Sequence, residues 1–363
     1  MKLMITGGHP APAIACLDEI RKSPDIHAVY VGRQYVSGSH EETFEYQEVG
    51  KRHTPFVAVS PGRFTRTLTV GTVREFLKIP GGMLEGFRVV SREKPDAVLS
   101  FGSYIALPIA IAARLQGIPV YTHEQTMHPG LGNRIISWFA RKVFVSFPQS
   151  ARYFRRQVTV TGNPIRAEVL KPTRPERTIE KSRPLIYITG GSLGSHSINE
   201  LIKAILPQLL EDYIVVHQTG NVAEYGDFQT LETIRTNLPG ELSRRYHPYT
   251  HIPGGQVGYL YSIADLVIAR SGANTFFELV ALRKPAILIP LPWSSHNEQH
   301  EQAQAYQEEG LGEVFLQDGR PEDLLALIRK MMADLSPYQR AFTNSKLASP
   351  ANAASRIIGE IIG

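Results

Sequence analysis

Two glycine-rich loops in the chain could bind phosphate groups. They occupy residues 6–9 and 189–192, and each begins within a tetrapeptide Ile-Thr-Gly-Gly, at 5–8 and 188–191, that ends a short apolar run. A glycine turn between a strand and a helix presents backbone N–H groups that attract anions. Neither loop is a complete G-x-G-x-x-G, and neither has the Lys-[Ser/Thr] of a P-loop. A single loop of this kind is more often a tight turn than a phosphate site. Because two such loops occur at equivalent positions in the two halves, a phosphate-binding role and a purely structural role are equally favoured.

A third turn, Ser-Gly-Ala-Asn-Thr at residues 271–275, follows a predicted strand at 266–269 and precedes a predicted helix at 276–282. Backbone N–H groups at a helix N-terminus, together with the helix dipole, could bind a diphosphate. Glu278 lies within the first two turns of this helix, where its carboxylate could accept hydrogen bonds from ribose hydroxyls. By position alone, an ordinary solvated glutamate is the favoured interpretation.

A polar, amide-rich loop at residues 293–302 follows the predicted strand at 286–289. Such a loop suits hydrogen bonding to sugar hydroxyls and an acetamido group, although it could also be an ordinary solvated loop. His296 and His300 lie beside Glu298 and Glu301, but their spacing is not H-E-x-x-H, and the chain has no Asp-x-Asp. No metal site is therefore expected, and no motif requires a divalent cation or other cofactor.

Two positions could supply a general base. His9 closes the first glycine loop, and His123-Glu124-Gln125 ends the predicted strand at 119–122. Both are expected to face a cleft between domains, where a histidine or carboxylate can deprotonate a sugar hydroxyl as it attacks. A structural capping role is the alternative for a lone histidine. His9 is the first candidate and Glu124 the second.

The elements that position these residues repeat in the two halves. Each glycine loop is followed by an apolar-periodic helix, predicted at about 12–21 and 196–210. Segment 171–184 has the composition of a linker. The fold class is therefore α/β, with two Rossmann-like, doubly wound domains facing across a cleft and ligands at the carboxyl ends of the strands. Further short apolar runs typical of buried parallel strands occur at 28–31, 97–101, 119–122, 143–145, 213–218, 266–269 and 286–289.

Composition excludes several classes of protein. The 363 residues suffice for two cores, and 42% hydrophobic with 20% charged residues is typical of a globular chain. The single cysteine, Cys16, forbids an internal disulfide. The best candidate for a transmembrane segment, the uncharged stretch 97–113, is short for a bilayer span and is interrupted by glycine and proline, so a soluble protein is expected. A net charge of +5 does not indicate nucleic-acid binding, but it suits an anionic membrane surface or a phosphorylated substrate.

Eight groups of residues, in order along nearly the whole chain, resemble glycosyltransferase family 28, whose members have the GT-B fold. The resemblance implies domains at 1–165 and 166–348, with a C-terminal helix at about 349–363 that returns to the first. Met4 and Ile5, where the family usually has glycines, indicate a divergent member. The matching groups are 6–13, 102–104 with Pro108, 123–125, 130–133, 162–166, 190–194, 270–273 with Glu278, and Gln299.

The family resemblance also implies substrates and residue roles. GlcNAc would pass from UDP-GlcNAc, with inversion, to the C4 hydroxyl of the MurNAc of lipid I (undecaprenyl-pyrophosphoryl-MurNAc-pentapeptide), giving lipid II for peptidoglycan synthesis. Acceptor-binding residues would be His9, Tyr104 and Asn133. Donor-binding residues would be Thr6, Gly7, Gly8, Arg166, Ser192, Ser271, Gly272, Ala273, Asn274, Thr275, Glu278 and Gln299.

A location at the cytoplasmic face of the cell membrane, as a peripheral protein, is also implied. Between residues 63 and 92, apolar side chains such as Phe64, Phe76, Leu77 and Phe87 alternate with arginines and lysines, and segment 133–143 adds Trp138 and further cations. Apolar groups among cations suit insertion at anionic headgroups. The alternative, that the aromatic residues belong to the core, is equally open.

Three other functions remain compatible with the sequence. A GT-B transferase with another lipid acceptor would share the donor site. A UDP-GlcNAc 2-epimerase would share the two-domain architecture but need no lipid, and the groups at 123–125 and 162–166 argue against it. A non-catalytic scaffold is disfavoured because His9, Glu278 and Gln299 are all present.

Overall fold

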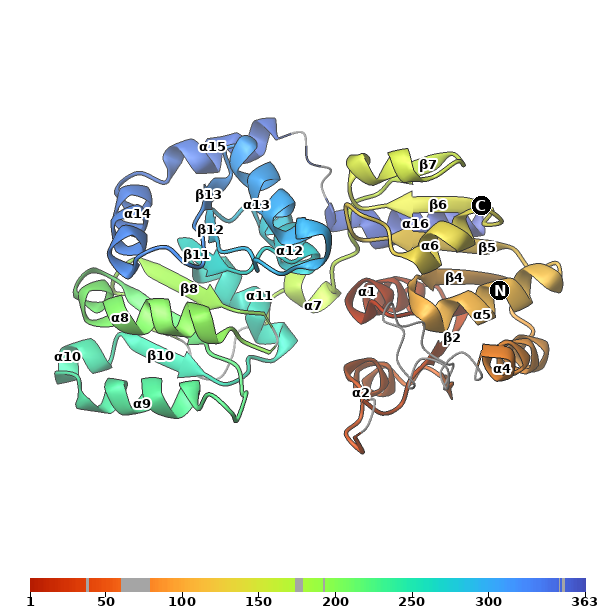
Figure 1. The fold of residues 1–363 in the computed structure, drawn as a ribbon, viewed down its shortest axis with the longest axis horizontal. Coiled ribbons are helices and arrows are strands. Elements are labelled where there is room, and N and C mark those ends of the chain that lie inside the picture. The colour runs from red at the N-terminus through yellow and green to blue at the C-terminus, as the bar shows by residue number, and fades with distance from the viewer. Residues whose placement is uncertain (37–38, 60–78, 174–178, 192, 346, 348–349) are drawn as a thin grey trace. The chain divides into compact units, whose positions relative to one another are not determined.

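The computed structural model describes residues 1–36, 39–59, 79–173, 179–191, 193–345, 347 and 350–363 (Figure 1). The chain divides into two compact units, one of Met1–Arg166 with Ala348–Gly363 and the other of Ala167–Leu347. Among the described residues, no helix is long and apolar enough to span a bilayer. The uncharged stretch at 97–113 is divided between a strand and the helix that follows it.

The first unit is built on a seven-stranded parallel sheet in the order β3-β2-β1-β4-β5-β6-β7. Its strands are β1 Lys2–Gly7, β2 His27–Gly32, β3 Phe56–Ala58, β4 Ala97–Phe101, β5 Val120–Glu124, β6 Lys142–Val145 and β7 Val158–Val160. Its helices are α1 Pro10–Ile20, α2 Phe44–Lys51, α4 Ile79–Glu93, α5 Ser103–Leu115, α6 Leu131–Ser137 and α16 Ala353–Ile362, with a 3₁₀ turn at Pro148–Tyr153 and another at Pro350–Asn352.

Strand alternation gives this sheet two apolar faces, and each is covered by helices. On one face Leu3 and Ile5 of β1 pack against α1 and α16, which contributes Ile357 and Ile361. On the other face Met4 packs in a cluster that includes Ile109 of α5. The C-terminal helix therefore completes the core of the first unit.

The second unit repeats this topology in a six-stranded parallel sheet, β10-β9-β8-β11-β12-β13. Its strands are β8 Leu185–Thr189, β9 Ile214–Gln218, β10 Tyr246–Tyr249, β11 Leu266–Ala269, β12 Ala286–Leu288 and β13 Gly312–Val314. Its helices are α7 Ala167–Leu170, α8 His196–Asp212, α9 Asp227–Asn237, α10 Gly240–Ser243, α11 Gly254–Ile263, α12 Ala273–Leu282, α13 Glu298–Glu308, α14 Pro321–Ala333 and α15 Ser336–Asn344, with a 3₁₀ turn at Ser295–Asn297.

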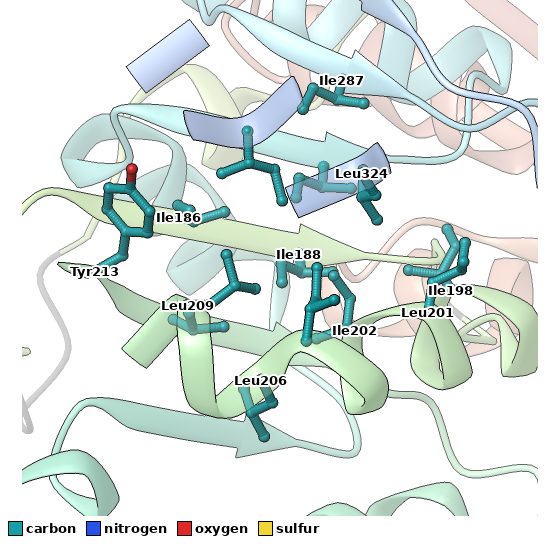
Figure 2. Packing of buried hydrophobic residues seen from close by; sticks show 14 of the residues in the cluster. Ile186, Ile188, Ile198, Leu201, Ile202, Leu206, Leu209, Tyr213, Ile287 and Leu324 are labelled. Atoms are coloured by element: carbon teal, nitrogen blue, oxygen red, sulfur yellow. The ribbon is translucent and has the colours of Figure 1, made fainter. Parts of the chain in front are cut away.

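Helix α8 seals one face of the second sheet. Its apolar stripe, which includes Ile198, Ile202 and Leu209, lies over Ile186 and Ile188 of β8 (Figure 2). Leu324 of α14 joins the same cluster. The expected α/β class with two doubly wound sheets is thus confirmed, and each sheet has a carboxyl edge at which loops can form a site.

Candidate active site

The first glycine loop is tightly packed at the carboxyl edge of the first sheet. Gly8 donates a backbone hydrogen bond to the Gly102 carbonyl (3.2 Å). A Cβ on Gly7 would lie 2.7 Å from the backbone of Phe101, and one on Gly8 would lie 2.6 Å from Cβ of Ser103. Only glycine allows this contact with the turn between β4 and α5. Ser103 itself adopts a φ of 73°, a costly conformation that is frequent at ligand sites.

His9 follows this loop and is the N-cap residue of α1, but its side chain does not cap the helix. Its Nδ1 lies 2.7 Å from Nε2 of Gln125, which follows β5. Burial lowers the pKa of His9, and the charge of nearby Glu124 opposes this shift. The ring is therefore neutral at pH 7, as a general base must be.

A base role for His9 also requires a particular tautomer. The proton must lie on Nδ1 so that the Nε2 lone pair is free. Gln125 holds that tautomer when its amide oxygen, rather than its nitrogen, faces the ring. Oε1 of Gln125 is buried without a hydrogen-bond partner, so a 180° rotation of the amide would both satisfy Oε1 and leave Nε2 of His9 able to accept a proton.

Glu124 is buried near His9, and each of its carboxylate oxygens accepts hydrogen bonds. Its carboxylate accepts hydrogen bonds from Thr126 N and Oγ1 (3.0 and 2.7 Å), Gly130 N (3.2 Å) and Asn133 Nδ2 (2.9 Å). Asn133 also donates to the His123 carbonyl and accepts from Thr122 Oγ1. Both side chains are 2% exposed or less. They fix the loop after β5 rather than presenting free atoms to a ligand.

His123 differs from its expected position facing a cleft. Its ring is buried inside the first unit, with Nε2 3.3 Å from the Gly162 carbonyl. Burial lowers the pKa of His123 to about 3. Because β5 continues to Glu124, two residues beyond the predicted end, His123 is an interior strand residue.

The remaining predicted residues of the first unit occupy three different settings. Thr6 is buried in β1, and its Oγ1 has no hydrogen-bond partner. Tyr104 is half-buried in the first turn of α5. Arg166 has its guanidinium 6.0 Å from the ring centroid of Phe44.

In the second unit, the 271–275 turn directly follows a buried arginine, Arg270, for which the sequence predicted no role. Arg270 donates to the carbonyls of Ile289 and Pro290 (3.1 and 3.2 Å). It also donates to Ser195 Oγ, Ser197 Oγ and Gln317 Oε1 (2.7, 2.6 and 2.6 Å). Burial lowers the pKa of Arg270 to about 10, so it stays charged at pH 7. Arg270 thereby joins the ends of β11 and β12 to the start of α8.

Helix α12 begins directly after this arginine. Gly272 is its N-cap residue, and the first intrahelical donor is Phe276, which bonds to the Gly272 carbonyl (2.9 Å). The backbone N–H groups of Ala273, Asn274 and Thr275 are therefore not used within the helix. Ser271 is buried, and its Oγ donates to the Gln299 carbonyl (2.7 Å).

Gln299 and Glu278 have fixed orientations beside this helix. Gln299 Oε1 accepts from Leu291 N (3.0 Å), and its Nε2 makes no hydrogen bond to the described residues. Glu278 is half-buried and accepts from the Tyr261 hydroxyl (3.2 Å). An amide donor and a carboxylate are thus held near a helix N-terminus, a combination suited to a sugar nucleotide.

The second glycine loop packs against the turn after β9. A Cβ on Gly194 (φ 79°) would lie 2.0 Å from the Thr219 carbonyl oxygen, so this position requires glycine. Ser192, a predicted donor residue, lies outside the described residues. Within the described part of the chain, His196, Glu200 and Asp227 form one group with three possible metal ligands, but Asp227 already accepts from His196 and Asn199.

Comparisons with known proteins agree with both units. Models described as the N-terminal and C-terminal domains of glycosyltransferase family 28 match residues 6–145 and 185–357. A Clostridium perfringens enzyme named UDP-N-acetylglucosamine–N-acetylmuramyl-(pentapeptide) pyrophosphoryl-undecaprenol N-acetylglucosamine transferase is 32% identical over 98% of this chain and 96% of its own. The enzyme of that name from Treponema denticola is 31% identical over 98% and 92%. The chain belongs to glycosyltransferase family 28.

Solved structures confirm the GT-B architecture of this family 28 enzyme. The crystal structure of Acinetobacter baumannii MurG matches it with a TM-score of 0.71 and 24% identity over 99% of both chains. UDP-GlcNAc 2-epimerase from Neisseria meningitidis, bound to UDP-GlcNAc, has a TM-score of 0.69 at 15% identity over 100% of both chains. Fold alone therefore does not separate transferases from epimerases, whereas the full-length sequence similarity is to transferases.

Each unit of the family 28 enzyme gathers its own subset of the predicted residues. The first contains the 6–9 loop, Tyr104, Glu124 and Asn133; the second contains the 271–275 turn, Glu278 and Gln299. Gln125 and Arg270 are additions from the structure. The sequence could have identified both residues. Gln125 belongs to the 123–125 group that matches the family, and Arg270 is a charged residue that directly follows a buried strand.

Replacing Glu124 by glutamine should destabilise the family 28 enzyme and reduce its activity. The amide nitrogen of glutamine cannot accept the hydrogen bonds that the carboxylate now accepts, so at least one buried donor loses its partner. We expect the free energy of unfolding to fall by about 1–3 kcal/mol, measured by urea denaturation. Glu41→Gln, at an exposed position, is the control. A Glu124→Gln protein as stable as the control would contradict this account of the loop.

Proposed function

We propose that this family 28 glycosyltransferase transfers GlcNAc from UDP-GlcNAc to the C4 hydroxyl of the MurNAc of lipid I, with inversion, and so forms lipid II for peptidoglycan synthesis. The observation that carries the proposal is the similarity, over 98% of the chain, to enzymes named as N-acetylglucosamine transferases for this lipid-linked acceptor. The site geometry supports it because each unit offers the groups that one of the two substrates needs.

The second unit binds the donor in this proposal. The N–H groups of the first turn of α12 receive the diphosphate, and the helix dipole stabilises the charge that develops on departing UDP. Glu278 binds the ribose, and Nε2 of Gln299 donates to a hydroxyl or the acetamido oxygen of GlcNAc. Arg270 holds these groups in fixed positions, because its hydrogen bonds connect the loop after β12 to the start of α8.

The first unit binds the acceptor and supplies the base. His9 removes the proton from the C4 hydroxyl as that oxygen attacks the anomeric carbon, and Gln125 orients its ring. Glu124 and Asn133 act through the loop that they hold, and the negative charge of Glu124 stabilises the imidazolium that forms. One displacement of this kind inverts the configuration of the α-linked sugar.

Transfer of labelled GlcNAc from UDP-GlcNAc to a short-chain lipid I analogue tests the proposal. A disaccharide product with a β1,4 bond is the expected result. Release of UDP without a glycolipid product would favour the 2-epimerase instead. Transfer to diacylglycerol but not to the lipid I analogue would favour a different glycolipid transferase, and binding of UDP-GlcNAc without any turnover would favour a scaffold.

We also propose that the enzyme is a peripheral protein of the cytoplasmic membrane face. Helices α4, α5 and α6 pack one against the next. They carry exposed apolar residues, among them Leu84, Phe87 and Trp138, and exposed Arg88 and Arg134 lie on the same helices. Phe139, by contrast, packs against the core. The part of this surface predicted from Phe64, Phe76 and Leu77 lies outside the described residues.

Replacing exposed apolar residues on these helices should weaken membrane binding. We expect Trp138→Ser combined with Phe87→Ser to lower binding to phosphatidylglycerol vesicles at least tenfold in a co-sedimentation assay, because each side chain contributes about 1.5–3 kcal/mol when buried. Trp293→Ser is the matched control, since Trp293 is 72% exposed in the second unit and Trp138 is 65% exposed in the first. An equal loss in the control, or none in the double variant, would argue against this surface.

A further inference from the structure

Arg33 occupies a distinctive place beside the first glycine loop. It is the first residue after β2, at the carboxyl edge of the sheet. Strands β1 and β2 are parallel, with Thr6 opposite Val31. Two residues further along, Arg33 is therefore level with Gly8, immediately before His9.

The side chain of Arg33 extends across the end of β1. Its guanidinium carbon lies 5.8 Å from the ring centroid of Tyr104, which follows β4 on the opposite side of β1. Neighbouring strands are about 4.8 Å apart, so β2 and β4 are separated by roughly 10 Å. The contact with Tyr104 therefore carries the guanidinium over the glycine loop.

Among the residues that the structure describes, no anion balances the guanidinium of Arg33. Nε of Arg33 is buried without a hydrogen-bond partner. Among the described residues, Arg33 donates no hydrogen bond and pairs with no carboxylate; its contact is with the face of Tyr104. The backbone is held in place, because Thr43 Oγ1 donates to the Arg33 carbonyl. Burying part of a charged group without a partner is unfavourable, which makes a purely structural role a poor explanation.

We propose that Arg33 binds the diphosphate of the lipid-linked acceptor. This inference rests on the proposed function, and it assigns a binding residue that the family motifs do not include. The planar fork of a guanidinium matches phosphate oxygens in a bidentate manner, and an aromatic face preorganises that plane. A diphosphate held above Gly8 by Arg33 places the attached sugar next to His9. Donor contacts remain with the second unit.

Steady-state kinetics with Arg33→Gln test this role. We expect the KM for a lipid I analogue to rise 10- to 100-fold, the range of charge-assisted hydrogen bonds, while the KM for UDP-GlcNAc and kcat change less than threefold. Arg21→Gln is the matched control, since Arg21 is exposed at the opposite end of α1. An unchanged acceptor KM, or a rise in the KM for UDP-GlcNAc instead, would overturn the proposal.

An acceptor with an uncharged linker in place of the diphosphate separates binding from folding effects. The wild-type enzyme should have a KM for this uncharged acceptor that is higher than its KM for the lipid I analogue by the factor expected for Arg33→Gln. With the uncharged acceptor, Arg33→Gln should raise the KM no further. Thermal unfolding provides a second readout. Because the guanidinium of Arg33 forms no hydrogen bond or ion pair with the described residues, Arg33→Gln should keep the Tm close to that of the wild type, whereas loss of a structural arginine would lower it.

Binding of farnesyl diphosphate to the full chain, measured by calorimetry without donor, keeps this inference distinct from the proposed function. We expect binding that Arg33→Gln weakens at least tenfold and Arg21→Gln leaves unchanged. If the wild type binds in this way but transfers no sugar to lipid I, the proposed function fails and the anion site stands. If it transfers sugar and Arg33→Gln binds farnesyl diphosphate normally, the anion site fails alone.

Discussion

His9→Ala is expected to lower kcat for GlcNAc transfer by about 10²–10⁴-fold and to leave the affinity for UDP-GlcNAc unchanged. The variant removes the one side chain of the first glycine loop that can accept a proton, whereas the first turn of α12, Glu278 and Gln299, proposed to bind the donor, lie in the second unit. Single-turnover transfer at saturating substrates measures the first quantity, and calorimetry with UDP-GlcNAc measures the second. A kcat within threefold of the wild type would remove His9 as the base.

The pH profile adds a test of how His9 is tuned. Burial lowers the pKa of His9 below 6.5, so the neutral ring persists to a lower pH than in a free histidine. The acid limb of kcat/KM should therefore lie below pH 6.5. Gln125→Glu places a carboxylate against the ring, which favours the imidazolium and raises the pKa. It should move the acid limb to higher pH, and a limb that stays in place would contradict the contact between these residues.

Arg270→Ala should cause the largest loss of stability in the second unit, about 3 kcal/mol or more of its free energy of unfolding. The guanidinium bonds to two buried backbone carbonyls, two serine hydroxyls and one amide oxygen. Alanine removes the donor to both carbonyls and leaves the three side-chain groups only the weaker bonds among Ser195, Ser197 and Gln317. Affinity for UDP-GlcNAc should fall as well, because Ser271 and the N-terminus of α12 follow directly. Urea denaturation and nucleotide calorimetry provide the two measurements.

Two further variants make the Arg270 result interpretable. Arg270→Lys keeps the charge, but one ammonium cannot reach all the acceptors that the fork spans, so an intermediate loss is expected. Arg244→Ala removes an arginine that is 75% exposed and ion-paired with Glu241, and should cost at most about 1 kcal/mol. If Arg270→Ala were no more harmful than Arg244→Ala, the buried network would not hold the donor loops as described.

The strands that sequence reasoning missed are those at the edges of the sheets. β3, β7, β10 and β13 are each hydrogen-bonded on one side only and have only three or four residues. An edge strand is half-solvated, so it lacks the continuous apolar run by which the central strands were predicted. β10 even contains Pro248, which is tolerated at an edge because no neighbour needs its missing N–H.

Residue types at the site were predictable, but the direction in which they point was not. Polar residues at strand ends were expected to face ligand. Glu124, Asn133 and Ser271 instead use their side chains within their own unit. Side chains alternate between the two faces of a strand, so an error of one residue reverses the face on which a side chain is expected, and sequence patterns do not define strand ends that closely. Gln299 differs from these residues, because its amide oxygen accepts from Leu291 N while its amide nitrogen forms no hydrogen bond with the described residues and can donate to a ligand.

Helix α16 also fixes the order in which the two units can mature on the ribosome. The second unit is one continuous stretch and can fold once it has emerged, whereas the core around Leu17 and Ile20 lacks Ile357 and Ile361 until α16 has been made. At about 5–20 residues per second, the intervening stretch takes on the order of ten seconds or more to translate. The unit that is synthesised first is therefore completed last, and its exposed apolar surface is a natural substrate for chaperones during that interval.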